Sequence, residues 1–442
     1  MHASRTLLLL LVALLPSLAR AELAPAEQRM AAAVEADQPR SVALLQRLVE
    51  QNSGTMNLQG VKAVAQLLRP EFEALGFSVQ WKPMALTGRA GHLIASRQGR
   101  RAGPHMLLIG HLDTVFEQDS PFRGFVREGD RALGPGVGDD KGGVVVMLSA
   151  LRAMHSAGTL EDANIEVVLT GDEEDVGAPF GLARADLIAA GKRADVALDF
   201  ENLACENGQD MGSIARRSSN SWTLTTAGHS GHSSTIFSQG MGDGAIFELA
   251  RIIAAFRAEL PEPNLTFNVG LLGGGQSATL DDAGVRIAAI GKSNIIPSTA
   301  IAKGDFRTLS QEQTDRVRAK MQAIVARHLT LTRATLTIEQ GYPAMPPTAG
   351  NRALLAKLNV VNRDLGLAPM AELDPLKRGA GDIAFVAADT DGLVGLGIAG
   401  AGSHAPGESA DLASLPRQAK RAAILMTRLS QSPRISASQQ LD

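Results

Sequence analysis

Short apolar runs and longer helical patterns alternate through the first half of the chain. Residues 105–109, 165–169 and 196–198 form short, largely apolar runs, and the apolar segment over 144–154 is long enough for a helix. Apolar residues at helical spacing predict two further helices within 25–76. Continuous apolar strands separated by helices are typical of parallel strands that are covered on both faces. We therefore predict an α/β fold built on a mostly parallel sheet.

The pattern changes near Gly212, where alternating polar and apolar residues replace the continuous apolar runs. The predicted order becomes strand, helix, strand, strand, helix, strand, with a possible extra pairing at 285–289. These six elements are expected over residues 222–226, 245–260, 265–271, 301–306, 310–328 and 331–338. After Gly341 the first style returns, with a helix over 351–365 and an apolar strand over 393–398. A small α+β domain with one open sheet face is therefore predicted to interrupt the first domain.

The first residues resemble a secretory signal. Arg5 precedes an apolar run over 6–15, and Ala19-Arg20-Ala21 is a small-x-small cleavage site. The apolar run is shorter than the ~20 residues that a membrane-spanning helix needs, and no later stretch is typical of a membrane span. We expect a signal peptide at 1–21, a mature chain that begins at Glu22, and a destination in the periplasm or outside the cell.

Composition narrows the classes of partner and of metal ligand. The formal net charge is -3, and the sequence has no mixed arginine and aromatic patch, so no nucleic-acid partner is expected. The chain has one cysteine, Cys205, which excludes an internal disulfide and a cysteine-based zinc site. We expect this cysteine to be a small buried residue. Any metal ion must be held by histidine, aspartate and glutamate.

Histidine and acidic residues gather in five segments, most of them at the ends of predicted strands. Ligands bind at the carboxyl ends of the strands in an open parallel sheet, so these side chains are expected to meet at one edge. The segments cover residues 110–115, 134–143, 170–174, 199–201 and 400–404.

The residue types in these segments suit metal chemistry. His111 follows an apolar strand, and Asp113 lies two residues on, so both side chains point the same way and the carboxylate can orient the imidazole. Asp139 lies in a glycine-rich loop that can bring its carboxylate inward. Glu173 and Glu174 are adjacent carboxylates that would repel unless a cation neutralises them. One of the two can bind a metal while the other acts as a base.

Taken in order, the five segments resemble the M20 family of metallopeptidases. The Gly-Pro-Gly-x-x-Asp-Asp-Lys-Gly-Gly motif at 134–143 and the Asp-Glu-Glu motif at 172–174 are especially similar to the glutamate carboxypeptidase branch, of the carboxypeptidase G2 type. The resemblance spans nearly all of the mature chain. It implies a zinc-hydrolase domain at 22–211 and 342–442, with a ferredoxin-like lid and dimerisation domain inserted at 212–341.

The resemblance also implies two zinc ions and assigns their ligands. Asp139 would bridge the two ions, and the Asp139–Asp140 peptide would be cis. One ion would be bound by His111, Asp139 and Glu201, and the other by Glu174, Asp139 and His404.

Catalytic and substrate-binding roles are implied in the same way. Glu173 is similar to the general base, and Asp113 to the residue that orients His111. In the lid, His232 is similar to a residue that stabilises the oxyanion in the partner subunit of a homodimer. Asn294 and Arg307 are similar to residues that bind the substrate carboxylate, and Gly381 lies in a glycine-rich loop at the substrate site.

The resulting prediction is a di-zinc hydrolase that cleaves an amide bond next to a free carboxylate in a peptide or N-acyl amino acid. Residues 339–343 lack the basic residue that this branch has after the last lid strand, so the amino acid released stays open. A carboxypeptidase or dipeptidase-like exopeptidase, an aminoacylase and an inactive zinc-binding protein are the alternatives. No ligand and no base is lost, which weighs against the inactive protein.

Overall fold

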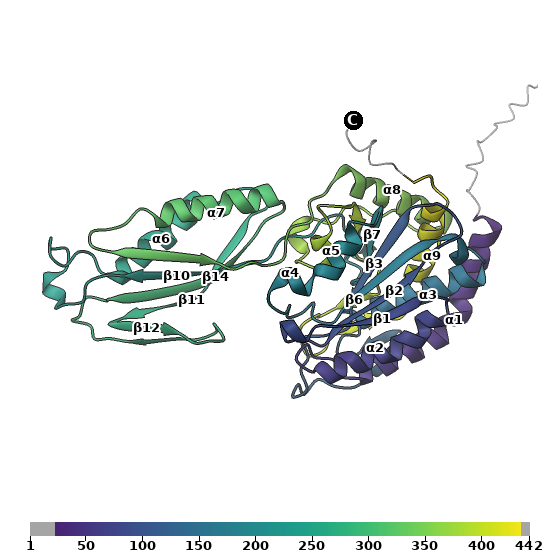
Figure 1. Cartoon of the computed structure of the whole chain (residues 1–442), viewed down its shortest axis with the longest axis horizontal. Helices are drawn as coiled ribbons and strands as arrows, with labels where there is room; N and C mark the ends of the chain where they lie inside the picture. Colours follow the sequence, from purple (N-terminus) through teal and green to yellow (C-terminus); the bar gives the residue numbers. More distant parts are fainter. Residues whose placement is uncertain (1–22, 435–442) are drawn as a thin grey trace, which may run out of the picture.

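The computed structural model describes residues 23–434, which form a large domain and a narrow domain that extends from it (Figure 1). We call them the catalytic domain and the lid, after the roles that the resemblance implies. The predicted signal peptide at 1–21 lies outside the described residues. Within 23–434, no helix combines the length and the apolar character that a membrane span requires.

A six-stranded sheet forms the centre of the catalytic domain, in the order β1-β2-β6-β3-β7-β16. The strands β6, β3, β7 and β16 are parallel to one another, and β1 and β2 are antiparallel additions at one edge. The mostly parallel α/β sheet predicted from the sequence is therefore confirmed. The strands are β1 (Ser78–Pro83), β2 (Gly91–Arg97), β3 (His105–His111), β6 (Asn164–Thr170), β7 (Val196–Asp199) and β16 (Gly392–Leu393).

Successive residues of β3 point to opposite sides of the sheet, and helices cover both of these faces. Met106 and Leu108 belong to the core under one helical layer, and Leu107 and Ile109 pack on the other side with Leu187. The first layer contains α1 (Pro25–Glu50), α2 (Leu58–Glu73), α3 (Lys141–Ser156) and α9 (Ser414–Ser430); α4 (Phe180–Ala183), α5 (Ala185–Gly191) and α8 (Ala349–Asp364) complete the helices of the domain.

The strand predicted over 393–398 is wrong in its length, since β16 ends at Leu393. Gly395 adopts φ +82°, a left-handed conformation that a strand cannot contain. The chain turns there, and the N–H groups of Leu396 and Gly397 donate to the carbonyls of Asp199 and Glu201. This segment therefore supports the loop that carries Glu201. A second small sheet, β17-β18-β5-β4, lies nearby and consists of β17 (Ala399–Ala401), β18 (Ser409–Asp411), β5 (Arg131–Leu133) and β4 (Val126–Glu128).

The lid is an antiparallel four-stranded sheet in the order β11-β14-β10-β15, which is the ferredoxin-like order. Trp222, Phe256 and Phe306 are fully buried between this sheet and the lid helices. The predicted extra pairing is the hairpin formed by β12 and β13. The lid elements are β10 (Asn220–Ala227), α6 (Ala245–Glu259), β11 (Thr266–Gly275), β12 (Ser277–Leu280), β13 (Ile287–Ile290), β14 (Thr299–Arg307), α7 (Gln311–Val325) and β15 (Arg333–Ile338).

Two chain segments connect the lid to the catalytic domain, and they pair with each other. Arg216 and Met345 exchange two backbone hydrogen bonds, of 3.0 and 2.9 Å, and the N–H of Ser219 donates to the carbonyl of Tyr342 at 3.0 Å. The entry and exit of the lid therefore form one short antiparallel ribbon.

Candidate metal centre

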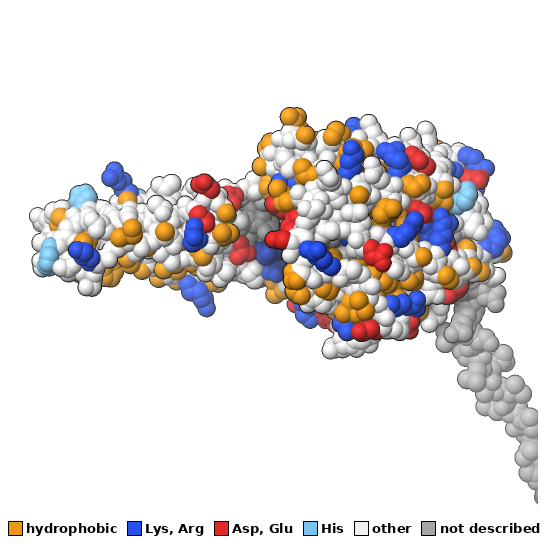
Figure 2. Space-filling model, turned by 90° about the horizontal axis from the view of Figure 1, so that it is seen from below, with side chains coloured by type: hydrophobic (Ala, Val, Ile, Leu, Met, Phe, Trp, Pro, Cys, Tyr) orange, Lys and Arg blue, Asp and Glu red, His pale blue; other side chains and the backbone are white. Residues whose placement is uncertain are grey.

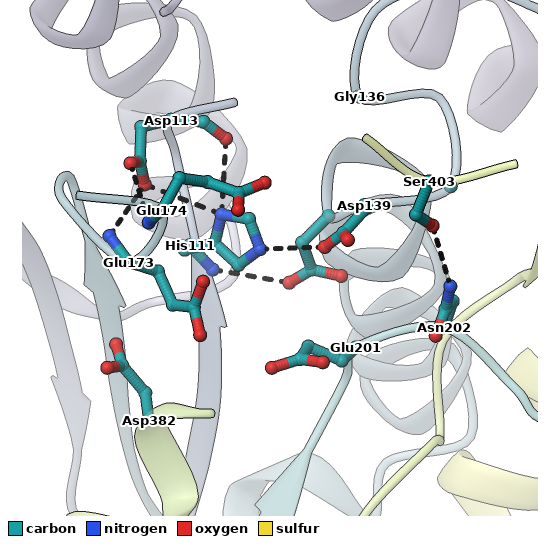
Figure 3. Close-up of polar contacts among 12 residues, drawn as sticks. His111, Asp113, Gly136, Asp139, Glu173, Glu174, Glu201, Asn202, Asp382 and Ser403 are labelled. Carbon is teal, nitrogen blue, oxygen red and sulfur yellow. Dashed lines mark hydrogen bonds and ion pairs between the residues drawn. The ribbon is translucent and has the colours of Figure 1, made fainter. Parts of the chain in front are cut away.

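The acidic and histidine segments predicted from the sequence meet at the carboxyl edge of the central sheet (Figure 3). His111 is the last residue of β3, Glu173 and Glu174 follow β6, and Glu201 follows β7. Asp139 reaches the same place from the loop before α3. Parallel topology explains this meeting, because β3, β6 and β7 are neighbours that all end at one edge.

Asp139 lies between the two histidines of the cluster. One carboxylate oxygen is 3.0 Å from His111 Nε2, and the other is 3.4 Å from His404 Nε2. Glu174 completes the second side, with its carboxylate oxygen 3.0 Å from His404 Nε2. The ligand atoms of His111, Asp139 and Glu174 all lie within 4.8 Å of one another. The Asp139–Asp140 peptide is cis, as expected from the resemblance.

The electrostatics of these groups reflect this crowding. Burial lowers the pKa of His111, but hydrogen bonds with Asp113 and Asp139 outweigh it and raise that pKa well above its usual range. Hydrogen bonds with Asp139 and Glu174 raise the pKa of His404 to about 10. Burial raises the pKa of Glu174 as well. The raised pKa values of the two histidines indicate that the carboxylates around them favour a positive charge in this cluster.

Asp113 organises the side of the cluster that holds His111. Its carboxylate is fully buried, and one oxygen lies 3.4 Å from His111 Nδ1. The N–H groups of Glu173 and Glu174 donate to Asp113 Oδ1 and Oδ2 at 3.0 and 3.1 Å, and the Thr55 hydroxyl donates to Oδ2 at 2.6 Å. His111 is therefore held by Nδ1, which leaves Nε2 directed at Asp139, and the same carboxylate anchors the two glutamates.

Glu408 holds the loop that carries Asp139. Its buried carboxylate accepts N–H groups from Gly136, Gly138 and Asp139 at 2.9, 2.8 and 3.0 Å. Burial raises the pKa of Glu408 to about 7, in spite of these three donors. Nothing in the residues around Glu408 indicates that this glutamate turns back onto the loop.

Glu201 lies in the same cavity, but its carboxylate is engaged elsewhere. It forms a close ion pair with Arg216 and lies 3.6 Å from Arg378 Nη2. Arg216 also lies 3.5 Å from Asp199. Glu201 is therefore not among the three side chains whose ligand atoms converge. For Glu201 to bind an ion together with His111, as predicted, its carboxylate would have to leave the ion pair with Arg216.

The converging residues fit a metal centre. Histidine nitrogens and carboxylate oxygens are the donors that zinc accepts in the absence of cysteine. Asp139 turns one oxygen to each histidine, which is the disposition of a bridging carboxylate. Glu173 remains beside this set, and burial together with the charges of Glu201 and Glu174 raises its pKa well above its usual range. A glutamate of raised pKa next to metal ligands is suited to accept a proton.

The predicted substrate residues divide into two groups. Arg307 lines the cavity of the metal centre, together with Arg216, Arg378 and Tyr342. Gly381 lies against this cavity, and a side chain on it would meet the Arg216 guanidinium and the Glu201 carboxylate. Glycine is thus the residue that leaves room for these two groups.

His232 and Asn294 lie together in the lid instead. The N–H of Ser233 donates to the Asn294 carbonyl at 2.9 Å, and His232 forms a bridge with Ile295. Both side chains are exposed, and neither lines the cavity of the metal centre. Within one chain, the structure does not bring them to the cluster.

The expectation for Cys205 is wrong, because this residue is exposed. It lies in β8 (Cys205–Glu206), which pairs with β9 (Gln209–Asp210) in a hairpin whose strands have two residues each. A hairpin of this length places side chains on the surface, away from the apolar core.

A ligand cluster beside a half-buried glutamate, at the carboxyl edge of a parallel sheet, is typical of a metal-dependent hydrolase. The chain belongs to the peptidase family M20/M25/M40, whose model matches residues 107–428. The predicted family and the predicted class of enzyme are therefore confirmed.

Two curated relatives and two solved structures illustrate the similarity. The chain is 28% identical over 402 residues to carboxypeptidase G2 from Pseudomonas sp. (strain RS-16), covering 88% of this chain and 89% of the relative. It is 27% identical over 296 residues to a succinyl-diaminopimelate desuccinylase from Azoarcus sp. (strain BH72), covering 65% of this chain and 72% of the relative.

Among solved structures, an M20 family metallo-carboxypeptidase from Sulfolobus solfataricus shares 15% identity with a TM-score of 0.64, covering 88% of this chain and 99% of that one. A dinuclear metal binding peptidase of the M20 family from Bacillus subtilis shares 16% identity with a TM-score of 0.63, covering 90% and 99%. At these identities the two structures support the fold.

Proposed function

We propose that the chain is a di-zinc hydrolase that cleaves an amide or peptide bond next to a free C-terminal carboxylate. The observation that carries the proposal is Asp139, whose two carboxylate oxygens face two different histidines while the half-buried Glu173 lies beside them. The similarity to carboxypeptidase G2 along most of the chain supports the same reaction.

In this proposal His111, Asp139 and Glu201 hold one ion, and Asp139, Glu174 and His404 hold the other. Bound metal ions would supply Lewis-acid activation of a water and of the amide carbonyl. Glu173 accepts the proton of the attacking water and returns it to the leaving nitrogen. Its raised pKa suits both steps, because the same carboxyl must take up and release a proton near neutral pH.

Cationic side chains at the cavity support recognition of a carboxylate. Arg307 lines this cavity, and its side chain is 34% exposed, so a substrate in the cavity can reach its guanidinium. Arginine binds a carboxylate through two parallel N–H donors. Tyr342 lies in the segment 339–343, which follows the last lid strand and contains no basic residue. Arg307 is thus our candidate for the substrate carboxylate, with Asn294 from a partner lid.

An aminoacylase that acts on N-acyl amino acids is the second candidate. Several relatives are named succinyl-diaminopimelate desuccinylases, which favours removal of an acyl group from nitrogen. The same metal centre and the same base would serve both reactions, so the substrate decides between them.

We further propose a homodimer formed through the lid, in an exported enzyme. Apolar side chains are exposed along the lid (Figure 2), among them Leu272 at 62% and Ile290 at 71%. A second chain that covers them would also explain how His232 and Asn294 reach a cavity. Light scattering of the mature chain tests the dimer, and a monomer at micromolar concentration would rule out the partner role of His232.

The decisive experiment measures release of free amino acid from a panel of dipeptides and N-acyl amino acids. The purified mature chain is assayed as prepared, after chelation, and after return of zinc. We expect cleavage that chelation abolishes and zinc restores, with the panel identifying the residue released. No cleavage of any panel member by a chain that demonstrably holds two zinc ions would overturn the proposal in favour of a zinc-binding protein.

A further inference from the structure

Tyr342, a side chain of the lid connection, contacts Glu173, the proposed general base. This residue lies where the chain leaves the lid, and its carbonyl accepts the N–H of Ser219 on the entering segment at 3.0 Å. Its hydroxyl points the other way and donates to the backbone carbonyl of Glu173 at 2.5 Å. A contact between residues 169 positions apart thus joins the lid connection to the general base.

The direction of this hydrogen bond follows from the neighbouring Arg184. Arg184 Nη2 donates to the phenol oxygen at 3.3 Å, and arginine has no acceptor. The phenol proton must therefore be directed elsewhere, and the Glu173 carbonyl lies in its reach. Arg184 is itself fixed, since it is fully buried and donates to Asp172 at 2.5 Å and to Asp382 at 2.7 Å.

Packing holds the ring as firmly as the hydroxyl. The Tyr342 ring lies edge-on to Phe180, with centroids 6.2 Å apart and an interplanar angle of 88°, and lies 5.1 Å from the Phe385 ring. Such aromatic contacts restrict the ring to one orientation. The phenol is thus aimed at one target before any substrate binds.

Both backbone groups of Glu173 are then fixed by side chains. Its N–H donates to Asp113 at 3.0 Å, and its carbonyl accepts the Tyr342 hydroxyl. Asp113 belongs to the metal side of the site, and Tyr342 to the lid connection. The peptide that carries the base is held between these two, and only the side-chain torsions of Glu173 remain free.

We propose that Tyr342 is a positioning residue that sets the location of Glu173 and couples it to the lid connection. This inference rests on the proposed role of Glu173 as base. Catalytic groups displaced by about 1 Å lose up to about 100-fold in rate, so loss of one of the two fixed backbone contacts should lower kcat. Substrate affinity should stay the same, because the hydroxyl is occupied by Glu173 and is not available to a ligand.

The test is Tyr342→Phe, which removes only the hydroxyl, with Thr332→Val as the matched control. Thr332 is buried, and its hydroxyl also donates to a backbone carbonyl, that of Leu329 at 2.9 Å, at a position outside the cavity of the metal centre. We expect kcat of the tyrosine variant to fall about 10- to 100-fold with KM within about twofold and the zinc content unchanged. The control should keep the wild-type kcat.

Each other outcome has a defined meaning. A raised KM with an unchanged kcat would make Tyr342 a substrate contact, and a lower melting temperature with unchanged kinetics would make it structural only; both overturn the inference. A wild-type chain that holds zinc but cleaves no panel member would overturn the proposed function instead, and the two failures are thereby separated.

A second measurement covers the case in which the phenylalanine variant does not fold. Tyr342 is the single tyrosine of the chain, so growth on 3-fluorotyrosine labels this phenol alone and keeps its donor. We expect one fluorine resonance that shifts when zinc is added to the metal-free protein, because Glu174, a proposed zinc ligand, is bonded directly to the Glu173 carbonyl that accepts from this phenol. A resonance that does not move while activity is restored would contradict the coupling.

Discussion

Glu408 offers a sharp test of how the metal centre is held in place, through the change Glu408→Gln. The side chain is 1% exposed, and its carboxylate accepts three backbone N–H groups on the loop that ends at Asp139. In the variant, one amide oxygen can still accept from Gly138 and Asp139. The amide NH2 then faces the N–H of Gly136, and two donors oppose each other.

The magnitudes predict different effects on folding and on metal binding. The pKa of Glu408 is raised to about 7, so an ionised carboxylate at this site costs about 3 kcal/mol above that pH. Glutamine removes this cost but strands one buried donor, which costs about 1–3 kcal/mol. The two nearly cancel in the free energy of unfolding. Displacement of the Asp139 loop has no such compensation, and disturbed support of a ligand typically weakens metal binding about 10- to 100-fold.

The pH dependence has a definite sign. Because the folded-state pKa of Glu408 lies above the unfolded value, its contribution to stability is present below about pH 4.5 and is lost as pH rises through about 7. The free energy of unfolding of the metal-free wild type should therefore decline between pH 5 and 8, and that of the metal-free Glu408→Gln variant should not. Chemical denaturation of both metal-free proteins across that range measures it.

The assay is calorimetric titration of zinc into metal-free protein, with Glu248→Gln as control. Glu248 is a fully buried lid carboxylate that accepts the N–H of Leu329 at 3.0 Å and pairs with Arg251 at 2.8 Å. Its substitution should destabilise the lid and leave zinc affinity unchanged. If Glu408→Gln binds zinc as tightly as the wild type, the reasoning about loop support is refuted.

Four further outcomes are expected. Glu173→Gln should lower kcat about 10²- to 10⁴-fold with the metal content unchanged, and near-normal turnover would exclude it as the base. Asp113→Asn should weaken zinc binding about 10- to 100-fold in the same titration, since one carboxylate orients His111 and anchors two glutamates. A hydrogen bond with Arg316 lowers the pKa of Glu262 to about 2, so this carboxylate stabilises the fold above about pH 4.5 and the stabilisation is lost as pH falls towards 2. The melting temperature of Glu262→Gln should therefore depend less on pH over that range. Zinc should bind in two unequal steps, because Glu201 must first leave its ion pair; equal sites would contradict this.

Much of the metal centre could be predicted from the sequence because its ligands are tied to local patterns. His111 ends an apolar strand, and Glu173 and Glu174 follow another, so the end of each run marks a position at the sheet edge. The lid could be predicted for a similar reason, since the change from continuous to alternating apolar residues marks an open sheet. The hairpin of β1 and β2 was missed, because β1 is a half-exposed edge strand and the apolar run of β2 covers only Leu93 to Ala95.

Side chains that hold the ligands in place have no such local mark. Glu408 contacts a loop about 270 positions earlier, and Tyr342 contacts Glu173 across 169 positions. Nothing in the residues around either one indicates its partner. The ion pair of Arg216 with Glu201 likewise depends on the ribbon that connects the lid, which brings Arg216 beside the end of β7. Only the folded chain identifies these contacts.

This division has a physical origin. The chemistry needs histidine and carboxylate groups at one sheet edge, and parallel topology brings them there independently of the loop conformations. Their exact separation depends on the loops, and here buried donors and acceptors fix it: three N–H groups on Glu408, two on Asp113, and one hydroxyl on the carbonyl of Glu173. Since each such group would cost free energy if left unpaired, the loops have few alternative positions. The ligands determine which reaction is possible, and these paired groups determine whether the ligands stand where the reaction needs them.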